Sequence, residues 1–349
     1  MRGIRNDANS FIQLDDWELD PIADYSGSDR KDGLISPDGT RYLVKYAEEH
    51  ARTNHLDTSY VNNVLCEYLA SNILKLAGFE VHDTFIATRN QELLVACKNF
   101  TSDEYHLIEF GRYMRKHYDS KDIGRVPDLA QLEFVFTRDP LLKKYTEELF
   151  ASYWERFIGD ALVGNFDRHM GNFGYLVSAK GDMKIAPVYD NGSTLFPALS
   201  EQGMKDTVLS SPKELMKRVL LYPKSALMIH GSKAGYRDLL TSGFDERVNR
   251  AVKATVPGMI ERMGLIYEFI DSQFILSDIK KTFYKKILDA RMEFILKPAL
   301  KCCESGEYDL EAKKRLESGE SYMEELFEEQ YNALRQSEIW QRMEALGEI

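Results

Sequence analysis

Residues 164–174 read Gly-Asn-Phe-Asp-Arg-His-Met-Gly-Asn-Phe-Gly, and residues 186–192 read Ala-Pro-Val-Tyr-Asp-Asn-Gly. Between them lie a short apolar run and a polar turn, which predict the two strands of a β-hairpin. The first stretch carries Asp167 and Asn172, and the second carries Asp190. The predicted hairpin therefore joins two carboxylates and a carboxamide. These three side chains are the starting point for assigning roles to residues elsewhere in the chain.

These residue types suit phosphoryl transfer. Asp167 and Asn172 have the spacing D-x-x-x-x-N found in kinase catalytic loops. Magnesium prefers oxygen ligands, so we expect Asn172 and Asp190 to bind Mg²⁺. We expect Asp167 to orient an acceptor hydroxyl and to accept its proton. The alternative is an ordinary polar loop, in which Asp167 caps a turn and Asn172 bonds to its own backbone.

The pattern G-N-x-D-R-H-x-x-N-F-G, followed by a strand and A-P-x-Y-D-N-G, resembles the HipA-like serine/threonine kinases over residues 157–196. Its D-R-H-x-x-N core is also similar to the catalytic loop of phosphatidylinositol 3/4-kinases. The resemblance implies an α+β, two-lobed protein-kinase-like fold with a small antiparallel-sheet N-lobe and a larger, mainly helical C-lobe. It also implies ATP and Mg²⁺ as cofactors, Asp167 as catalytic base, and Asn172 and Asp190 as metal ligands.

The catalytic loop departs from the usual kinase pattern in one respect. Many kinases carry a lysine near the asparagine, whereas this chain has Met170 and Gly171 there. We therefore expect another cation, Arg168 or His169, to stabilise charge on that side. The alternative for His169 is that it braces the catalytic loop rather than taking protons. The second motif is Tyr-Asp-Asn-Gly in place of Asp-Phe-Gly, so control by a mobile phenylalanine is not expected.

A lysine and a glutamate upstream fit the same interpretation. Residues 41–46 alternate as a strand, which places Lys45 and Leu43 on one face. Residues 59–77 have the apolar spacing of an amphipathic helix, and Glu67 lies among its apolar and small residues. We expect Lys45 to bind nucleotide phosphates and Glu67 to pair with it. An exposed strand lysine and a surface helix charge are the alternatives.

The segment 24–34 has the composition of a phosphate-covering loop, in which small residues let backbone amides approach phosphates. A plain hairpin turn would look the same. The nucleotide contacts expected from this loop are Ser26, Gly27, Ser28 and Lys31. In HipA-like kinases a serine of this loop can be autophosphorylated, so the resemblance points to the Ser26 or Ser28 hydroxyl.

A hairpin with strands at 84–88 and 93–97 is predicted next, followed by a hinge over 98–101. The adenine contacts expected here are the backbone groups of Ala96, Lys98 and Phe100. This hinge would divide an N-lobe of residues 1–97 from a C-lobe of residues 102–349.

Amphipathic patterns predict several helices in the C-lobe. They span 146–163, 245–256, 258–276 and 278–297, with a charged helical tail over 309–346. The mixed charge of this tail predicts a solvated helix face, and a docking role is the alternative. Residues 103–145 mix helix-like and turn-like stretches. Acceptor specificity is expected from 103–145 and 198–240.

The net charge and the composition of the chain indicate which classes of partner it can bind. A formal charge of −11 argues against direct nucleic-acid binding, although the resemblance leaves open a small DNA-binding antitoxin as partner. No apolar run approaches the roughly 18 residues of a membrane span, so no membrane partner is expected. The four cysteines lack metal-site spacing and indicate reduced thiols in a cytoplasmic protein.

Three functions remain in competition. The favoured one is an ATP- and Mg²⁺-dependent kinase that phosphorylates serine or threonine hydroxyls of proteins. A toxin role in a toxin–antitoxin pair and autophosphorylation are two further expectations that this function allows. The second is a small-molecule or phosphoinositide-type lipid kinase, which would catalyse the same phosphoryl transfer to a different acceptor. A lipid kinase would need a basic surface facing the membrane, and the net negative charge of the chain disfavours this. A catalytically silent nucleotide-binding protein would not need five chemically matched residues, namely Lys45, Glu67, Asp167, Asn172 and Asp190.

Overall fold

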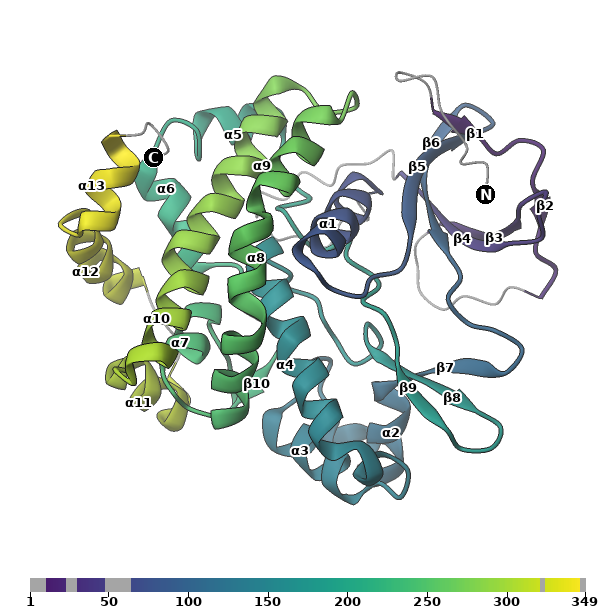
Figure 1. Cartoon of the computed structure of the whole chain (residues 1–349), viewed down its shortest axis with the longest axis horizontal. Helices are drawn as coiled ribbons and strands as arrows, with labels where there is room; N and C mark the ends of the chain where they lie inside the picture. Colours follow the sequence, from purple (N-terminus) through teal and green to yellow (C-terminus); the bar gives the residue numbers. More distant parts are fainter. Residues whose placement is uncertain (1–10, 23–29, 48–63, 321–323, 346–349) are drawn as a thin grey trace.

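The computed structural model describes residues 11–22, 30–47, 64–320 and 324–345. The chain forms a strand-rich N-lobe and a larger helical C-lobe, with one helix packed between them (Figure 1). This is the two-lobed α+β architecture expected from the sequence. No helix of the part that is described is long and apolar enough to cross a membrane.

The N-lobe is built on a six-stranded sheet with the order β1-β5-β6-β4-β3-β2. All neighbouring strands are antiparallel except β1 and β5, which run parallel, so the sheet is mixed at one edge. The strands are β1 Ile12–Gln13, β2 Glu18–Leu19, β3 Lys31–Ile35, β4 Arg41–Tyr46, β5 Thr84–Arg89 and β6 Glu92–Lys98.

Period-two alternation assigns the sheet residues to two faces as predicted. One face buries a cluster that includes Leu34, Val44 and Leu94. The other face, which carries Lys45 and Leu43, packs against helix α1. The predicted β5–β6 hairpin is present, and its two turn residues have the positive φ angles of a tight hairpin turn.

Helix α1 (Val64–Ala77) packs on β5 and β6 with one side and on the long C-lobe helix α8 with another (Figure 1). Its buried residues follow the predicted helical spacing and include Leu69 and Ile73. Gly78 ends the helix with a φ of 107°, which favours glycine. The predicted first residues of this helix, 59–63, lie outside the described residues.

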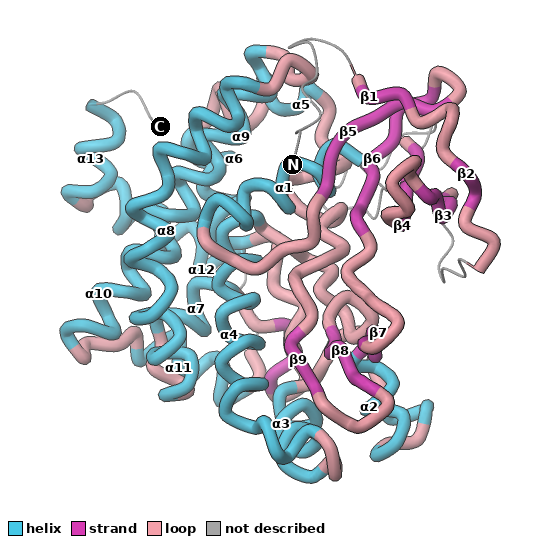
Figure 2. Tube along the Cα trace, turned by 45° about the vertical axis from the view of Figure 1, so that its right-hand side comes forward, coloured by secondary structure: helices cyan, strands magenta, loops and turns pink. Residues whose placement is uncertain are grey.

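The C-lobe is mainly helical, and α4 and α8 pack against each other at its centre (Figure 2). Short 3₁₀ and π-helical turns connect several of the elements. The helices are α2 Phe110–His117, α3 Leu129–Arg138, α4 Thr146–Val163, α5 Glu201–Asp206, α6 Pro212–Met216, α7 Tyr236–Thr241, α8 Glu246–Ser272, α9 Asp278–Arg291, α10 Lys297–Ser305, α11 Leu310–Ser318, α12 Glu324–Arg335 and α13 Glu338–Ala345.

A three-stranded antiparallel sheet lies beside the helices and carries the predicted hairpin. Its order is β7-β8-β9, and a separate small hairpin pairs β10 with β11. The strands are β7 Tyr105–Glu109, β8 Gly174–Ser178, β9 Met183–Ile185, β10 Met228–Ile229 and β11 Ser232–Lys233. A side chain at Gly174 would collide with the Ile108 carbonyl, so the glycine lets β7 approach β8 closely.

The sequence predicted two helices where the structure has the single helix α8. Pro257 lies inside it. Proline removes one backbone hydrogen bond, but the flanking Val256 and Met259 are buried, and the helix packs on α1, α4 and α10 along its length. Tertiary packing therefore stabilises a continuous helix across Pro257, although a proline at this position would end an isolated helix.

The tail over 309–346 is helical as predicted, but the expectation that it is simply solvated was wrong. The region forms α11, α12 and α13, and it buries Phe327, Trp340 and Met343 in the C-lobe core. The many charged residues of this region made its few apolar positions easy to overlook. Those positions are sufficient for three short helices to pack against the rest of the lobe.

Candidate active site

The catalytic loop begins where α4 ends. Gly164 adopts the left-handed conformation (φ 68°) and stops the helix. Within the loop, Asn165 accepts a hydrogen bond from the Asp167 backbone N–H at 2.9 Å, and the Asn172 Nδ2 donates to the Asp167 carbonyl at 2.8 Å. Asp167 is thus held between two amide side chains before any substrate is considered.

Arg168 is the structural centre of this loop. Its guanidinium donates from Nε and Nη2 to the two carboxylate oxygens of Asp160 at 3.0 and 2.8 Å, and from Nη2 to the Asn191 Oδ1 at 2.7 Å. A further nitrogen donates to the carbonyls of Asn172 and Tyr189. Burial would lower the pKa of Arg168, but the Asp160 carboxylate outweighs it and raises the pKa.

This arrangement corrects the expectation that Arg168 supplies charge to a phosphoryl group. The side chain is buried, and its donors are used by Asp160, by Asn191 and by main-chain carbonyls. Arg168 instead ties α4, the catalytic loop and the segment that carries Asp190 into one unit.

Arg168→Lys is expected to lower the free energy of unfolding by about 2–4 kcal/mol, because an ammonium cannot reproduce the bidentate and carbonyl contacts of the buried guanidinium. Urea denaturation measures this change. Arg250→Lys is the matched control, since Arg250 pairs with Glu147 on the surface. Equal stability of the two variants would contradict the structural role of Arg168.

His169 takes a different position from the one expected of a phosphoryl-binding cation. Its Nδ1 accepts the Gly171 backbone N–H at 3.0 Å, and its own backbone N–H donates to the Asp167 carbonyl at 2.7 Å. The Tyr189 hydroxyl completes the turn by donating to the Gly171 carbonyl at 3.0 Å. These bonds show that His169 braces the tight part of the loop.

The predicted pair between Lys45 and Glu67 is present. The Lys45 Nζ donates to the Glu67 Oε2 at 2.9 Å and to the Asp190 Oδ1 at 2.6 Å. The Glu67 side chain is fully buried, whereas the Asp190 side chain is 41% exposed. Burial alone would lower the pKa of Lys45, but Asp190 and Glu67 together raise it well above its usual value.

Glu67 has partners besides the lysine. Its Oε1 accepts the Asn191 backbone N–H at 3.0 Å and lies 3.2 Å from the His82 Nε2. Burial would raise the pKa of the carboxyl, yet Lys45 and His82 hold it well below its ordinary range. Glu67 therefore stays ionised, and it links β4 and α1 of the N-lobe to the segment after β9.

Asp190 lies at the junction of the lobes. Val188 pairs with Val81 in a parallel bridge, which fastens the segment after β9 to the chain that follows α1. Asp190 itself has a φ of 57°, a conformation uncommon for a residue other than glycine and more frequent at functional sites. Its carboxylate is directed back to Lys45.

The donor atoms in this region fit a hard divalent cation. The Asn172 Nδ2 is bonded to the Asp167 carbonyl, which leaves the amide oxygen Oδ1 as a ligand atom. Asp190 adds an exposed carboxylate. An amide oxygen, a carboxylate and nucleotide phosphates form the kind of oxygen ligand set that Mg²⁺ takes in kinases.

Asp167 has a cation partner that the sequence did not predict. Its side chain is 10% exposed, and the Arg125 Nη2 donates to its two carboxylate oxygens at 3.0 and 3.1 Å. Burial raises the pKa of Asp167 and the Asp190 carboxylate adds to the rise, which the Arg125 guanidinium opposes. Arg125 comes from the chain between α2 and α3, where no motif marked it.

The expected nucleotide contacts are only partly described. Ser26, Gly27 and Ser28 lie outside the described residues. Lys31, predicted in a loop, begins strand β3 directly opposite Lys45, so the two lysines share one face of the sheet.

The predicted adenine contacts need adjustment. Ala96 lies inside β6 between β4 and β5, so its backbone belongs to the sheet rather than to an adenine site. The Lys98 N–H donates to the Asp83 carbonyl at 2.8 Å. Phe100 follows the sheet, and its ring lies 5.5 Å from that of Tyr189 and 6.4 Å from that of His82. The adenine contacts are therefore expected after Lys98.

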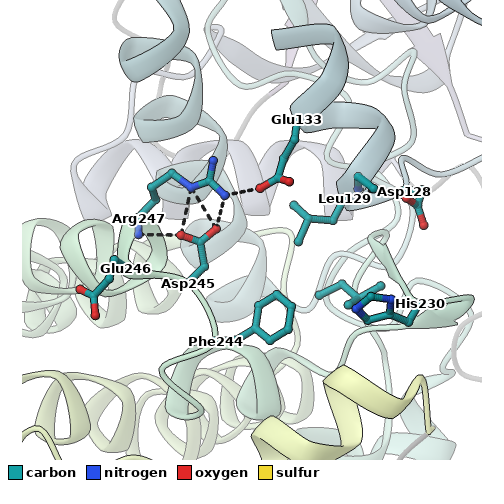
Figure 3. Close-up of a pocket in the computed structure, with 10 residues that line it drawn as sticks. Asp128, Leu129, Glu133, His230, Phe244, Asp245, Glu246 and Arg247 are labelled. Atoms are coloured by element: carbon teal, nitrogen blue, oxygen red, sulfur yellow. Dashed lines mark hydrogen bonds and ion pairs between the residues drawn. The ribbon is translucent and has the colours of Figure 1, made fainter. Parts of the chain in front are cut away.

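A pocket of about 470 Å³ lies elsewhere on the C-lobe, between the N-terminal ends of α3 and α8 and the β10–β11 turn (Figure 3). Its lining includes Leu129, His230 and Phe244. Arg247 pairs there with Asp245 and Glu133. The lining comes in part from 103–145 and 198–240, the two regions expected to select the acceptor.

Comparison with known proteins agrees with this fold. The crystal structure of the Helicobacter pylori proinflammatory kinase CtkA superposes with a TM-score of 0.76 and 28% identity, and covers 86% of this chain and 100% of that chain. The fold and the site together define a two-lobed protein-kinase-like enzyme.

The profile of the HipA-like C-terminal domain matches residues 21–257, and the chain belongs to this family. Serine/threonine-protein kinase CtkA of Helicobacter pylori strain J99 is 29% identical over 281 residues, which are 80% of this chain and 84% of CtkA. The protein is thus a HipA-like kinase related to CtkA. A more distant structure is Shewanella oneidensis HipA, solved with HipB and operator DNA (14% identity, TM-score 0.46, 82% of this chain and 70% of that chain).

Proposed function

We propose that this protein transfers the γ-phosphoryl group of Mg²⁺-bound ATP to a serine or threonine hydroxyl of a protein. The observation that carries the proposal is the contact of Lys45 with both Glu67 and Asp190, beside a catalytic loop that holds Asp167 and Asn172. Relationship to a serine/threonine kinase supports the choice of acceptor.

Each residue has a role that follows from its surroundings. Glu67 fixes the position of the Lys45 ammonium, which can then bind nucleotide phosphates. Asn172 and Asp190 would hold Mg²⁺, which supplies neutralisation of phosphate charge when bound. Asp167 would orient the acceptor hydroxyl and accept its proton.

Two narrower expectations rest on the family resemblance alone. One is a toxin role with a small DNA-binding antitoxin as partner. The other is autophosphorylation of Ser26 or Ser28, which mass spectrometry of the active protein would detect.

Incubation of the purified protein with Mg²⁺, γ-labelled ATP and a cell lysate tests the proposed reaction. We expect label on protein bands with the native chain, and none with Asp167→Asn. Nucleotide turnover with label in small molecules or lipid would overturn the protein acceptor. Absence of both binding and turnover in folded protein would overturn the kinase function.

Asp190→Asn is expected to remove most of the Mg²⁺-dependent part of ATP binding, because an amide is a weaker and neutral ligand. Calorimetric titration of ATP with and without Mg²⁺ measures this difference. Asp182→Asn, an exposed carboxylate in the β8–β9 turn, is the control. Unchanged Mg²⁺ dependence in Asp190→Asn would contradict its assignment as a ligand.

A further inference from the structure

Many kinases have a lysine in the catalytic loop that supplies positive charge, but no side chain of this loop is available to do so. Met170 and Gly171 occupy the position, Arg168 is buried in a structural network, and His169 braces the turn. Lys45 is engaged with Glu67 and Asp190. A cation on the acceptor side of the site must therefore come from another element.

Arg125 meets that requirement. It donates to both oxygens of Asp167, while 59% of its side chain remains exposed. The Arg125 side chain thus contacts the carboxylate proposed as the base, and its exposed part is accessible to a bound substrate. An arginine is always charged and presents several N–H donors in a plane, which suits contact with phosphoryl oxygens.

The chain around Arg125 is anchored on both sides. The Gln131 Nε2 donates to the Asp122 carbonyl at 2.9 Å, before Arg125. The Met228 backbone N–H donates to the Pro127 carbonyl at 2.9 Å, after it. The short span between these anchors keeps Arg125 beside Asp167, so its position does not depend on a long loop finding the site.

We propose that Arg125 is a catalytic residue of this kinase, and that its guanidinium contacts the transferring phosphoryl group from the acceptor side. The inference rests on the proposed function. In that reaction the acceptor oxygen bonds to the γ-phosphorus, the bond to the β,γ-bridging oxygen breaks, ADP leaves, and the hydroxyl proton goes to Asp167. Arg125 forms no covalent bond. It neutralises charge that builds on the equatorial oxygens.

The test compares affinity for ADP with Mg²⁺ against affinity for ADP with Mg²⁺ and aluminium fluoride, which imitates the transferring group. The native protein is expected to bind the second mixture more tightly. Arg125→Ala should reduce this preference by about a hundredfold and Arg125→Lys by less, with affinity for ADP and Mg²⁺ unchanged in both. Lys121→Ala, an exposed lysine of the same segment, should behave as the native protein does.

Phosphoryl transfer measured on the same variants should show a lower kcat for Arg125→Ala at an unchanged KM for ATP. Asp167 is buried, but 59% of the Arg125 side chain is exposed, so the midpoint of urea unfolding should stay close to that of the native protein in all variants. A preserved aluminium fluoride preference, or a faster Arg125→Ala enzyme, would overturn the inference and leave the kinase function standing. If the native protein binds no nucleotide, the proposed function fails and this inference fails with it.

Discussion

Replacement of Asp167 by asparagine is expected to reduce phosphoryl transfer by roughly 10²–10⁴-fold, the usual contribution of a general base. Asparagine has nearly the same shape, but its amide cannot accept the proton of an acceptor hydroxyl. The fold of the loop should survive, because Asn165 and Asn172 bond to the backbone of residue 167 rather than to its side chain. Nucleotide affinity should therefore remain close to that of the native chain.

Initial rates at saturating Mg²⁺ and ATP, together with calorimetric affinities, measure the two quantities separately. Asp182→Asn, in the β8–β9 turn, is again the control for a carboxylate-to-amide change. If Asp167→Asn loses nucleotide binding as well as transfer, Asp167 supports the nucleotide site and is not the base.

Lys45→Met should impair both stability and nucleotide binding. The substitution leaves the fully buried Glu67 carboxylate without its ammonium partner, and removal of one member of a buried pair costs about 3–5 kcal/mol. The cost should lie near the lower end, because His82 and the Asn191 N–H remain beside Glu67. ATP affinity should fall since the phosphates lose their cation.

A double variant separates these two effects. Glu67→Gln added to Lys45→Met removes the unpaired charge, so the double variant should be more stable than Lys45→Met alone, while ATP binding stays weak. Lys75→Met breaks an exposed ion pair with Asp83 and should change stability by no more than about 1 kcal/mol. Additive losses in the double variant would show that the pair is not coupled.

Much of the N-lobe could be predicted because its signals are local. Alternation in 41–46 assigns Lys45 to the α1 face, and the apolar spacing around Glu67 predicts the helix. The contact between these residues then follows from the order of the elements. The adenine contact expected at Ala96 was misplaced, because sequence alone does not show that β6 lies between β4 and β5.

The missed features depend on tertiary structure. Arg125 and Asp167 come from separate segments of the C-lobe, and nothing in the composition of 103–145 distinguishes Arg125 from its neighbouring cations. Arg168 was expected to face substrate, and only the buried Asp160 on α4 reveals its structural role. Pro257 was expected to divide a helix that packing holds together.

Phosphoamino-acid analysis of label transferred from γ-labelled ATP to lysate proteins tests the central claim most directly. The account predicts phosphoserine or phosphothreonine, produced in the presence of Mg²⁺ and absent with Asp167→Asn. Label confined to small molecules or lipids, or label on protein that persists with Asp167→Asn, would contradict it.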